Sequence, residues 1–203
     1  LLVVPFSLER LLVLGLTLAV TVSGYLDDRS PRPWGDLAKG VIDLVIAAAA
    51  SAVVVAGGVG EVWLPFTKAT FHVSPLIYGA VVTAVLWTSI NTTNCSDGVD
   101  GLSSTLVLLA LLSLGGFLYF VVGHGAISEY FLVPHYPDAA GWAIMSFVLV
   151  GSLTGYLWHN AHPSSLLMGD AGSRALGFFI GIAVMETGNP ALIAIVATVL
   201  LVN

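Results

Sequence analysis

The sequence predicts an all-α, polytopic membrane protein with about seven transmembrane helices. Three observations predict this class. Hydrophobic residues make up 57% of the 203 residues and charged residues only 9%, whereas soluble domains are about 25% charged. The mean hydropathy is +0.97. Long runs such as "STLVLLALLSLGGFLYFVV" are apolar on every face, so they lack the alternation of a membrane β-strand.

Each predicted helix is an apolar run close to the roughly 17 to 25 residues that cross a bilayer. In chain order, polar segments separate the runs: "DDRSPRPWGDLAK", "EVWLPFTKATFHVS", "NTTNCSDGVDG", "GHGAISEYFLVPHYPDAAG", "HNAHPSSLLMGDAGSR" and "ETGNP". The predicted helices cover residues 8–26, 40–60, 75–91, 102–122, 141–158, 173–187 and 190–203. Within the second polar segment, apolar and polar residues alternate around Thr67 and Lys68, which favours a short outer β-hairpin near 62–73.

Crossing the membrane once per run places alternate polar segments on the same side. The first, third and fifth segments then share one side, and they hold the clustered aspartates and asparagines. That side also carries more basic residues, namely Arg29, Arg32, Lys39 and Arg174, against Arg10 and Lys68 opposite. The positive-inside rule therefore predicts that the acidic segments face the cytoplasm. Asp43, three residues into its predicted helix, is expected at the membrane interface rather than in a proton relay.

The composition also excludes some functions. A net charge of -6 with six Lys and Arg provides no basic track for a nucleic acid. A single cysteine, Cys95, cannot form an internal disulfide or a zinc cluster.

The paired carboxylates of Asp27 and Asp28 repel one another unless they share a cation or a proton. Oxygen ligands from Asp and Asn favour magnesium over zinc, and magnesium often takes further ligands from a diphosphate. In "MGDAGS", Gly169 and Gly172 allow a tight turn, and Ser173 is expected to cap a helix that begins near Arg174. Free N–H groups at such a helix start favour a phosphate.

Three motifs, "GYLDDRS", "NTTNCSDGVDGL" and "HNAHPSSLLMGDAGSRALGF", carry a family resemblance. The sequence resembles the polyprenyl-phosphate N-acetylhexosamine-1-phosphate transferase superfamily (glycosyltransferase family 4), and within it the phospho-N-acetylmuramoyl-pentapeptide transferases, the MraY family. The resemblance implies Mg2+-dependent transfer of phospho-MurNAc-pentapeptide from UDP-MurNAc-pentapeptide to undecaprenyl phosphate, which yields lipid I and UMP. It further implies a homodimer in the bacterial inner membrane with a cytoplasmic active site. Residues 1–203 would then form a single transmembrane catalytic domain, truncated at both ends relative to a ten-helix protein.

The resemblance also assigns roles to residues. It implies catalytic roles for Asp27, Asp28 and Asp170, with Asp27 as the base toward the lipid phosphate and with Asp170 and Asp28 as metal ligands. The residues that it implies for substrate binding are Asn94, Asp97, Gly98, Asp100, Asn160 and His162.

Some departures from the family pattern leave alternatives open. Leu167 stands where the family often has an aromatic residue, and "DDRS" is closer to the WecA style. The family's first helices and triple-histidine loop have no counterpart in the sequence. One alternative is therefore a WecA-like transferase that uses UDP-GlcNAc; another, from a different class, is an ion-coupled transporter, although transporter sites usually lie near the bilayer midplane. The residues also leave open whether the lipid attacks directly or an aspartate attacks first.

Overall fold

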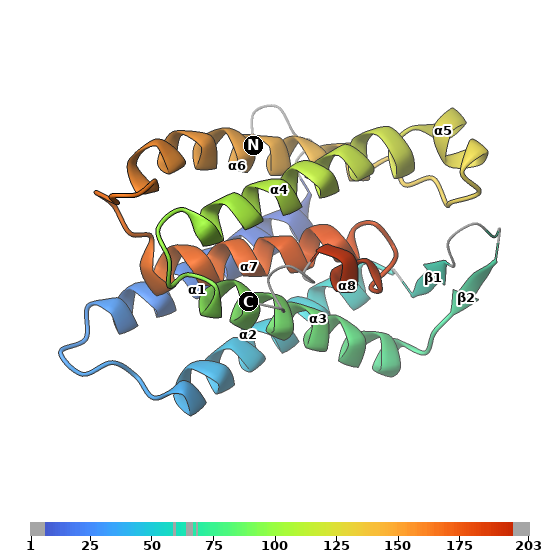
Figure 1. Ribbon diagram of the computed structural model, residues 1–203. Helices are drawn as coiled ribbons and strands as arrows, with labels where there is room; N and C mark the ends of the chain where they lie inside the picture. Colours follow the sequence, from blue (N-terminus) through green and yellow to red (C-terminus); the bar gives the residue numbers. More distant parts are fainter. Residues whose placement is uncertain (1–6, 59, 64–66, 68, 197–203) are drawn as a thin grey trace.

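The computed structural model describes residues 7–58, 60–63, 67 and 69–196. These residues form a helical bundle with one small β-hairpin at its far end (Figure 1). The long helices are α1 (Leu8–Asp28), α2 (Asp36–Ala56), α3 (Pro75–Cys95), α4 (Leu102–Gly116), α6 (Ala139–Asn160) and α7 (Gly169–Met185). The shorter elements are β1 (Glu61–Trp63), β2 (Thr70–His72), the π-helix η1 (Phe117–Val122), α5 (Gly125–Tyr130) and α8 (Leu192–Val196).

The described residues contain five helical segments that are long and apolar enough to cross a membrane. They are α1, α2, α3, residues 102–122 and α6. The prediction of an all-α, multi-pass membrane protein is therefore confirmed. The sixth predicted helix corresponds to α7, which has 17 residues. The seventh, 190–203, is described only as far as residue 196, where α8 ends, and the rest of that prediction lies outside the described residues.

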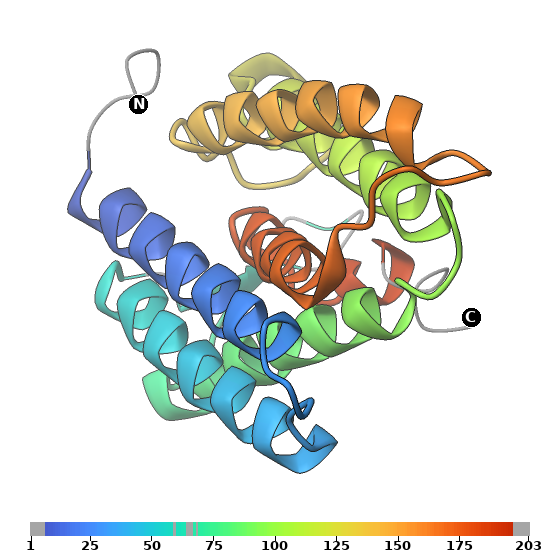
Figure 2. The same ribbon diagram turned by 90° about the vertical axis from the view of Figure 1, so that its left-hand side faces the viewer.

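Helix α7 lies at the centre of the bundle, with α1, α3 and α4 packed around it (Figure 2). Every residue from 177 to 185 is buried. A helix segment that is surrounded by other helices buries every face, and this accounts for the uniformly apolar sequence of residues 175–185.

The predicted β-hairpin is confirmed. Strands β1 and β2 pair in antiparallel register, with Glu61 opposite His72. Trp63 Nε1 donates to the carbonyl oxygen of Thr187 at 2.8 Å, and Asn189 Nδ2 donates to the carbonyl oxygen of Trp63 at 3.2 Å. These two bonds attach the hairpin to the chain that follows α7.

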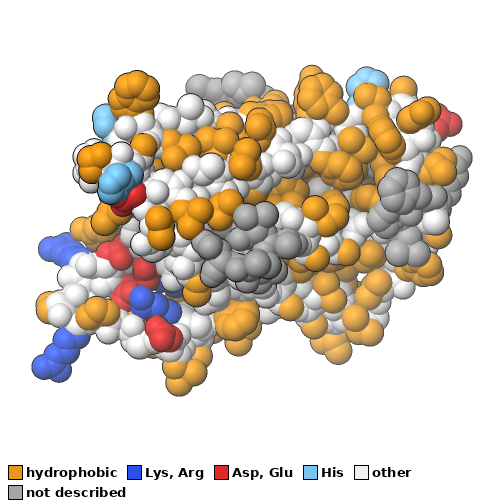
Figure 3. Space-filling model, in the orientation of Figure 1, with side chains coloured by type: hydrophobic (Ala, Val, Ile, Leu, Met, Phe, Trp, Pro, Cys, Tyr) orange, Lys and Arg blue, Asp and Glu red, His pale blue; other side chains and the backbone are white. Residues whose placement is uncertain are grey.

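The opposite end of the bundle carries most of the charge. Lys, Arg, Asp and Glu side chains gather where α1 leads into α2, whereas the middle of the visible surface is largely hydrophobic (Figure 3). The loops that follow α1 and α3, and the loop that precedes α7, lie at this same end (Figure 1). The three acidic segments that were predicted to share one side therefore lie at one end of the bundle (Figure 1).

Gly177 permits the close approach of α7 to α3. A Cβ at this position would lie 2.5 Å from the backbone oxygen of Ser89 and 2.8 Å from Cα of Ile90. We expect Gly177→Ala to lower the free energy of unfolding by about 1–3 kcal/mol, because backbone atoms cannot move aside cheaply. Thermal unfolding of the purified protein in detergent would measure this. Gly151→Ala on α6 is the matched control, since a Cβ there meets nothing within 4 Å, and an unchanged midpoint for Gly177→Ala would contradict the packing argument.

Candidate active site

The end of α1 caps the start of α7. Asp28 Oδ1 accepts a hydrogen bond from the backbone N–H of Asp170 at 3.2 Å, and Asp28 Oδ2 accepts one from the N–H of Ala171 at 3.1 Å. A carboxylate here satisfies two N–H groups of the first turn and favourably opposes the positive end of the helix dipole. Asp28 therefore fixes the position of the first turn of α7.

This arrangement corrects the expected start of α7. The helix begins at Gly169, not near Arg174, and Ser173 lies inside it. The Ser173 hydroxyl donates to the carbonyl oxygen of Gly169 at 2.9 Å instead of capping the helix. Two of the N–H groups that were expected to be free for a phosphate are bound by Asp28.

Gly169 is required by this contact. Its φ of +61° lies in the left-handed region, which favours glycine. A Cβ at Gly169 would also stand 2.6 Å from Asp28 Oδ2. Both constraints explain the glycine that precedes Asp170.

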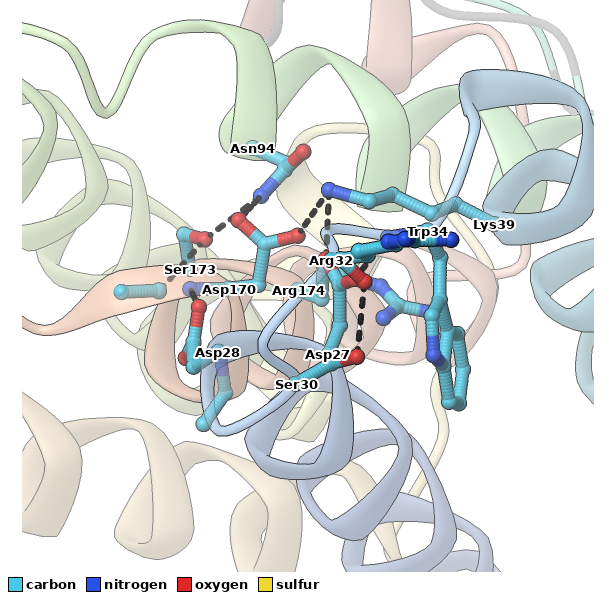
Figure 4. A network of polar contacts seen from close by, with 12 residues as sticks. Asp27, Asp28, Ser30, Arg32, Trp34, Lys39, Asn94, Asp170, Ser173 and Arg174 are labelled. Atoms are coloured by element: carbon cyan, nitrogen blue, oxygen red, sulfur yellow. Dashed lines mark hydrogen bonds and ion pairs between the residues drawn. The ribbon is translucent and has the colours of Figure 1, made fainter.

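Lys39, near the start of α2, joins two of the predicted catalytic carboxylates. Its Nζ contacts Asp27 Oδ2 at 2.5 Å and Asp170 Oδ2 at 2.8 Å (Figure 4). The other oxygen of Asp27 accepts the backbone N–H of Trp34 at 2.6 Å. Asp27 is buried, whereas Asp170 is partly exposed. One ammonium group thus holds α1, α2 and α7 together at the charged end.

The contacts of Lys39 with Asp27 and Asp170 belong to a first network of polar side chains. Asn94, at the end of α3, completes it. Its Nδ2 donates to Asp170 Oδ1 and to Ser173 Oγ, both at 3.0 Å (Figure 4). Both oxygens of Asp170 therefore have partners, one from α2 and one from α3. Side chains from α2 and α3 restrict the rotamer of Asp170, while Asp28 of α1 holds its backbone N–H.

A second network joins the α3–α4 loop to the α6–α7 loop. Asp100 Oδ2 lies 3.2 Å from His162 Nδ1 and accepts the N–H of Ser164 at 3.3 Å. Asn160 is buried, and its Oδ1 accepts bonds from Gly101 N–H and from Ser104 Oγ at 3.0 and 2.9 Å. Asn160 therefore positions the start of α4, while the His162 side chain remains 86% exposed and accessible to a ligand.

Asp97 and Gly98 lie in the α3–α4 loop that borders the first network. Gly98 is exposed and Asp97 is half-buried. Burial, together with the negative charges of Asp170 and Asp28, raises the pKa of Asp97 above its usual range. The charges of Asp170 and Asp28 therefore act on Asp97, although Asp97 lies in the α3–α4 loop and not on α1 or α7.

Asp43 lies inside the bundle. It is buried, and its Oδ1 accepts bonds from both Nε (3.2 Å) and Nη2 of Arg174. Sequence reasoning missed this ion pair and also the bridging role of Lys39. The available signal was the spacing of four residues from Lys39 to Asp43 and from Asp170 to Arg174, which places each pair on one helix face.

The donor set of the first network fits a divalent cation. Among the described residues, no three His, Cys, Asp or Glu side chains gather closely enough to hold a metal by themselves. Magnesium, however, is usually held by only one or two carboxylates together with substrate phosphates. Oxygens of Asp27 and Asp170 already converge on a single positive centre, Lys39 Nζ. Three carboxylates against one ammonium leave an excess of negative charge at this end of the bundle.

Comparisons with known proteins agree with the geometry. The model of the family described as "Glycosyl transferase family 4" matches residues 10–188. The phospho-N-acetylmuramoyl-pentapeptide-transferase of Treponema pallidum is 48% identical over 205 residues, which covers 97% of this chain and 55% of that protein. The protein of the same name from Campylobacter curvus is 36% identical over 177 residues, 85% of this chain and 48% of that protein. The chain spans about half the length of these curated relatives.

Proposed function

The chain belongs to glycosyl transferase family 4, and from this membership we propose that it carries the active site of a phospho-N-acetylmuramoyl-pentapeptide transferase. The reaction transfers phospho-MurNAc-pentapeptide from UDP-MurNAc-pentapeptide to undecaprenyl phosphate, giving lipid I and UMP. The observation that carries this proposal is the meeting of Asp27, Asp28 and Asp170 at one end of a membrane helical bundle. One substrate is a lipid and the other a soluble nucleotide, so the site must lie at the boundary between bilayer and water.

The chemical steps use few protein groups. An oxygen of undecaprenyl phosphate attacks the sugar-proximal phosphorus of the donor, and the bond between that phosphorus and the UMP oxygen breaks. Asp27 Oδ2 accepts the proton of the lipid phosphate, whose second pKa near 6 leaves part of it monoanionic at neutral pH. Phosphoryl transfer depends mainly on positioning and on charge stabilisation. We favour this direct attack over a route through a phospho-aspartate, because the lipid phosphate is itself a nucleophile and phosphoryl transfer asks little covalent chemistry of the protein.

The proposed cofactor is Mg2+, held by Asp170 and Asp28 together with donor phosphates. When bound there, it supplies positive charge to the diphosphate and to the leaving UMP. Asp97, Gly98 and Asp100 on one loop and Asn160 and His162 on the other form the proposed walls around the donor. The exposed His162 ring and Gly98 backbone offer contacts to the nucleotide or sugar.

The proposed location is the bacterial inner membrane, with this end of the bundle facing the cytoplasm and with two copies forming a homodimer. More of the basic side chains lie at the carboxylate end, as the positive-inside rule requires of a cytoplasmic face. Residues 1–203 are proposed to belong to a single catalytic domain.

Release of UMP tests the function. We expect the full-length protein in detergent to release UMP from UDP-MurNAc-pentapeptide when undecaprenyl phosphate and Mg2+ are present, and to stop when EDTA is added or the lipid is omitted. Release from UDP-GlcNAc alone would instead support a WecA-like transferase. If neither donor yields UMP from a folded protein, the transferase proposal fails, and ion flux in proteoliposomes would test the transporter alternative.

A further inference from the structure

Two ion pairs join α2 to α7, one helical turn apart. Lys39 on α2 pairs with Asp170 on α7, and four residues further along both helices Asp43 pairs with Arg174. The signs are reversed from one pair to the next, so each helix carries one positive and one negative side chain on the same face. Residues four apart on a helix are neighbours, and each charge therefore lies within reach of two opposite charges.

The two pairs differ in burial. The side chains of Lys39 and Asp170 are 20% and 22% exposed, whereas those of Asp43 and Arg174 are only 2% and 1% exposed. Charge is screened least where water is excluded. If Arg174 were neutral, Asp43 would be a buried carboxylate without a cation. It would then attract Lys39, which lies one turn away on the same helix.

We propose that Asp43 and Arg174 are positioning residues for the carboxylate site, which consists of Asp27, Asp28 and Asp170. Because Asp43 and Arg174 neutralise each other, Lys39 stays paired with Asp27 and Asp170. Removal of Arg174 would draw Lys39 toward Asp43 and away from the two carboxylates. Removal of Asp43 would release Arg174 toward Asp170, on its own helix. The consequence for turnover rests on the proposed function, whereas the consequence for cation binding does not.

The test measures the affinity for Mn2+, by paramagnetic resonance of the free ion, and kcat for UMP release. We expect Arg174→Gln to tighten Mn2+ binding about tenfold, because Lys39 no longer competes, and to lower kcat about thirtyfold. Asp43→Asn should weaken Mn2+ binding by about tenfold, because Arg174 now competes. The double variant Asp43→Asn/Arg174→Gln should stay within about threefold of the wild type in both measurements, since neither charge is left unpaired.

The opposite signs separate positioning from loss of structure, because a merely destabilised bundle would weaken binding in both single variants. Lys39→Met/Arg174→Gln should bind Mn2+ no more tightly than Lys39→Met. Ser51→Ala is the matched control. Ser51 donates a partly buried bond from α2 to the carbonyl oxygen of Gly79 at 2.7 Å, about two turns beyond Asp43, and its loss should leave Mn2+ affinity unchanged. If Arg174→Gln does not fold, Asp43→Asn is compared with Asp43→Asn/Arg174→Gln: Mn2+ binding that the second substitution does not restore overturns the inference, because that substitution removes the competing guanidinium.

Equal changes in both single variants, or no change in either, would overturn the inference. If the wild type releases no UMP, the proposed function fails while the Mn2+ series still tests the pair.

Discussion

Asp170→Asn is expected to reduce UMP release by about a thousandfold, the largest loss of any single substitution in this chain. The asparagine is nearly isosteric, so Asn94 and Lys39 keep a neighbour of the same shape, but the negative charge that would bind a cation is removed. Steady-state rates with UDP-MurNAc-pentapeptide and undecaprenyl phosphate at increasing Mg2+ would measure the effect. Extra metal should not restore the rate.

Asp36→Asn is the matched control for this experiment. Asp36 is an exposed aspartate in the first turn of α2, at the same end of the bundle. It should retain activity within about threefold, because exposed charges far from the substrate are screened. A rate for Asp170→Asn above about a tenth of wild type would refute the assignment of Asp170, given how large such electrostatic contributions usually are.

Lys39→Met is expected to give the second largest effect, with changes of opposite direction in binding and turnover. Without the ammonium, Asp27 and Asp170 repel one another, and a divalent cation becomes the group that relieves the repulsion. Mn2+ should therefore bind about tenfold more tightly. The value of kcat should fall about a hundredfold, because Asp27 loses the partner that orients it and the diphosphate loses a fixed positive charge.

Arg29→Met supplies the comparison for Lys39, since Arg29 is an exposed basic residue just beyond the end of α1. Losing one positive charge there should change neither Mn2+ affinity nor kcat by more than about threefold. Weaker Mn2+ binding in Lys39→Met would show that the lysine supports the cation site instead of competing for it.

The apolar runs were sufficient to predict the five described helical segments that are long and apolar enough to cross a membrane, because length and composition are local properties of the sequence. Counting loops by side was also sufficient to bring Asp28, Asn94 and Asp170 to one end, since consecutive crossings alternate. The start of α7 could not be predicted in this way. Ser173 satisfies the local rule for a cap, but the actual capping group is Asp28 of α1, and a contact between distant segments leaves no local pattern.

Asp43 shows a second limit of sequence reasoning. The predicted helix began at residue 40 and placed Asp43 near the interface, whereas α2 begins at Asp36. Those four residues place Asp43 about one turn further from the start of the helix, and its side chain is buried because it faces Arg174 of α7. Lys39 then falls within the helix instead of in a basic loop, and the matching charges on α7 show why both residues face inward.

The burial of α7 has a consequence for how the protein is made. This helix carries Asp170 and Arg174 in its first two turns, and a charged side chain within a membrane is costly unless it pairs or reaches the interface. Helices α1, α2 and α3 precede it in the chain, so Lys39, Asp43 and Asn94 are synthesised before their partners on α7. Insertion of α7 beside these helices replaces exposure to lipid by ion pairs. The carboxylate site is thus assembled last, when the sixth long helix enters a bundle whose first three helices are already in the bilayer.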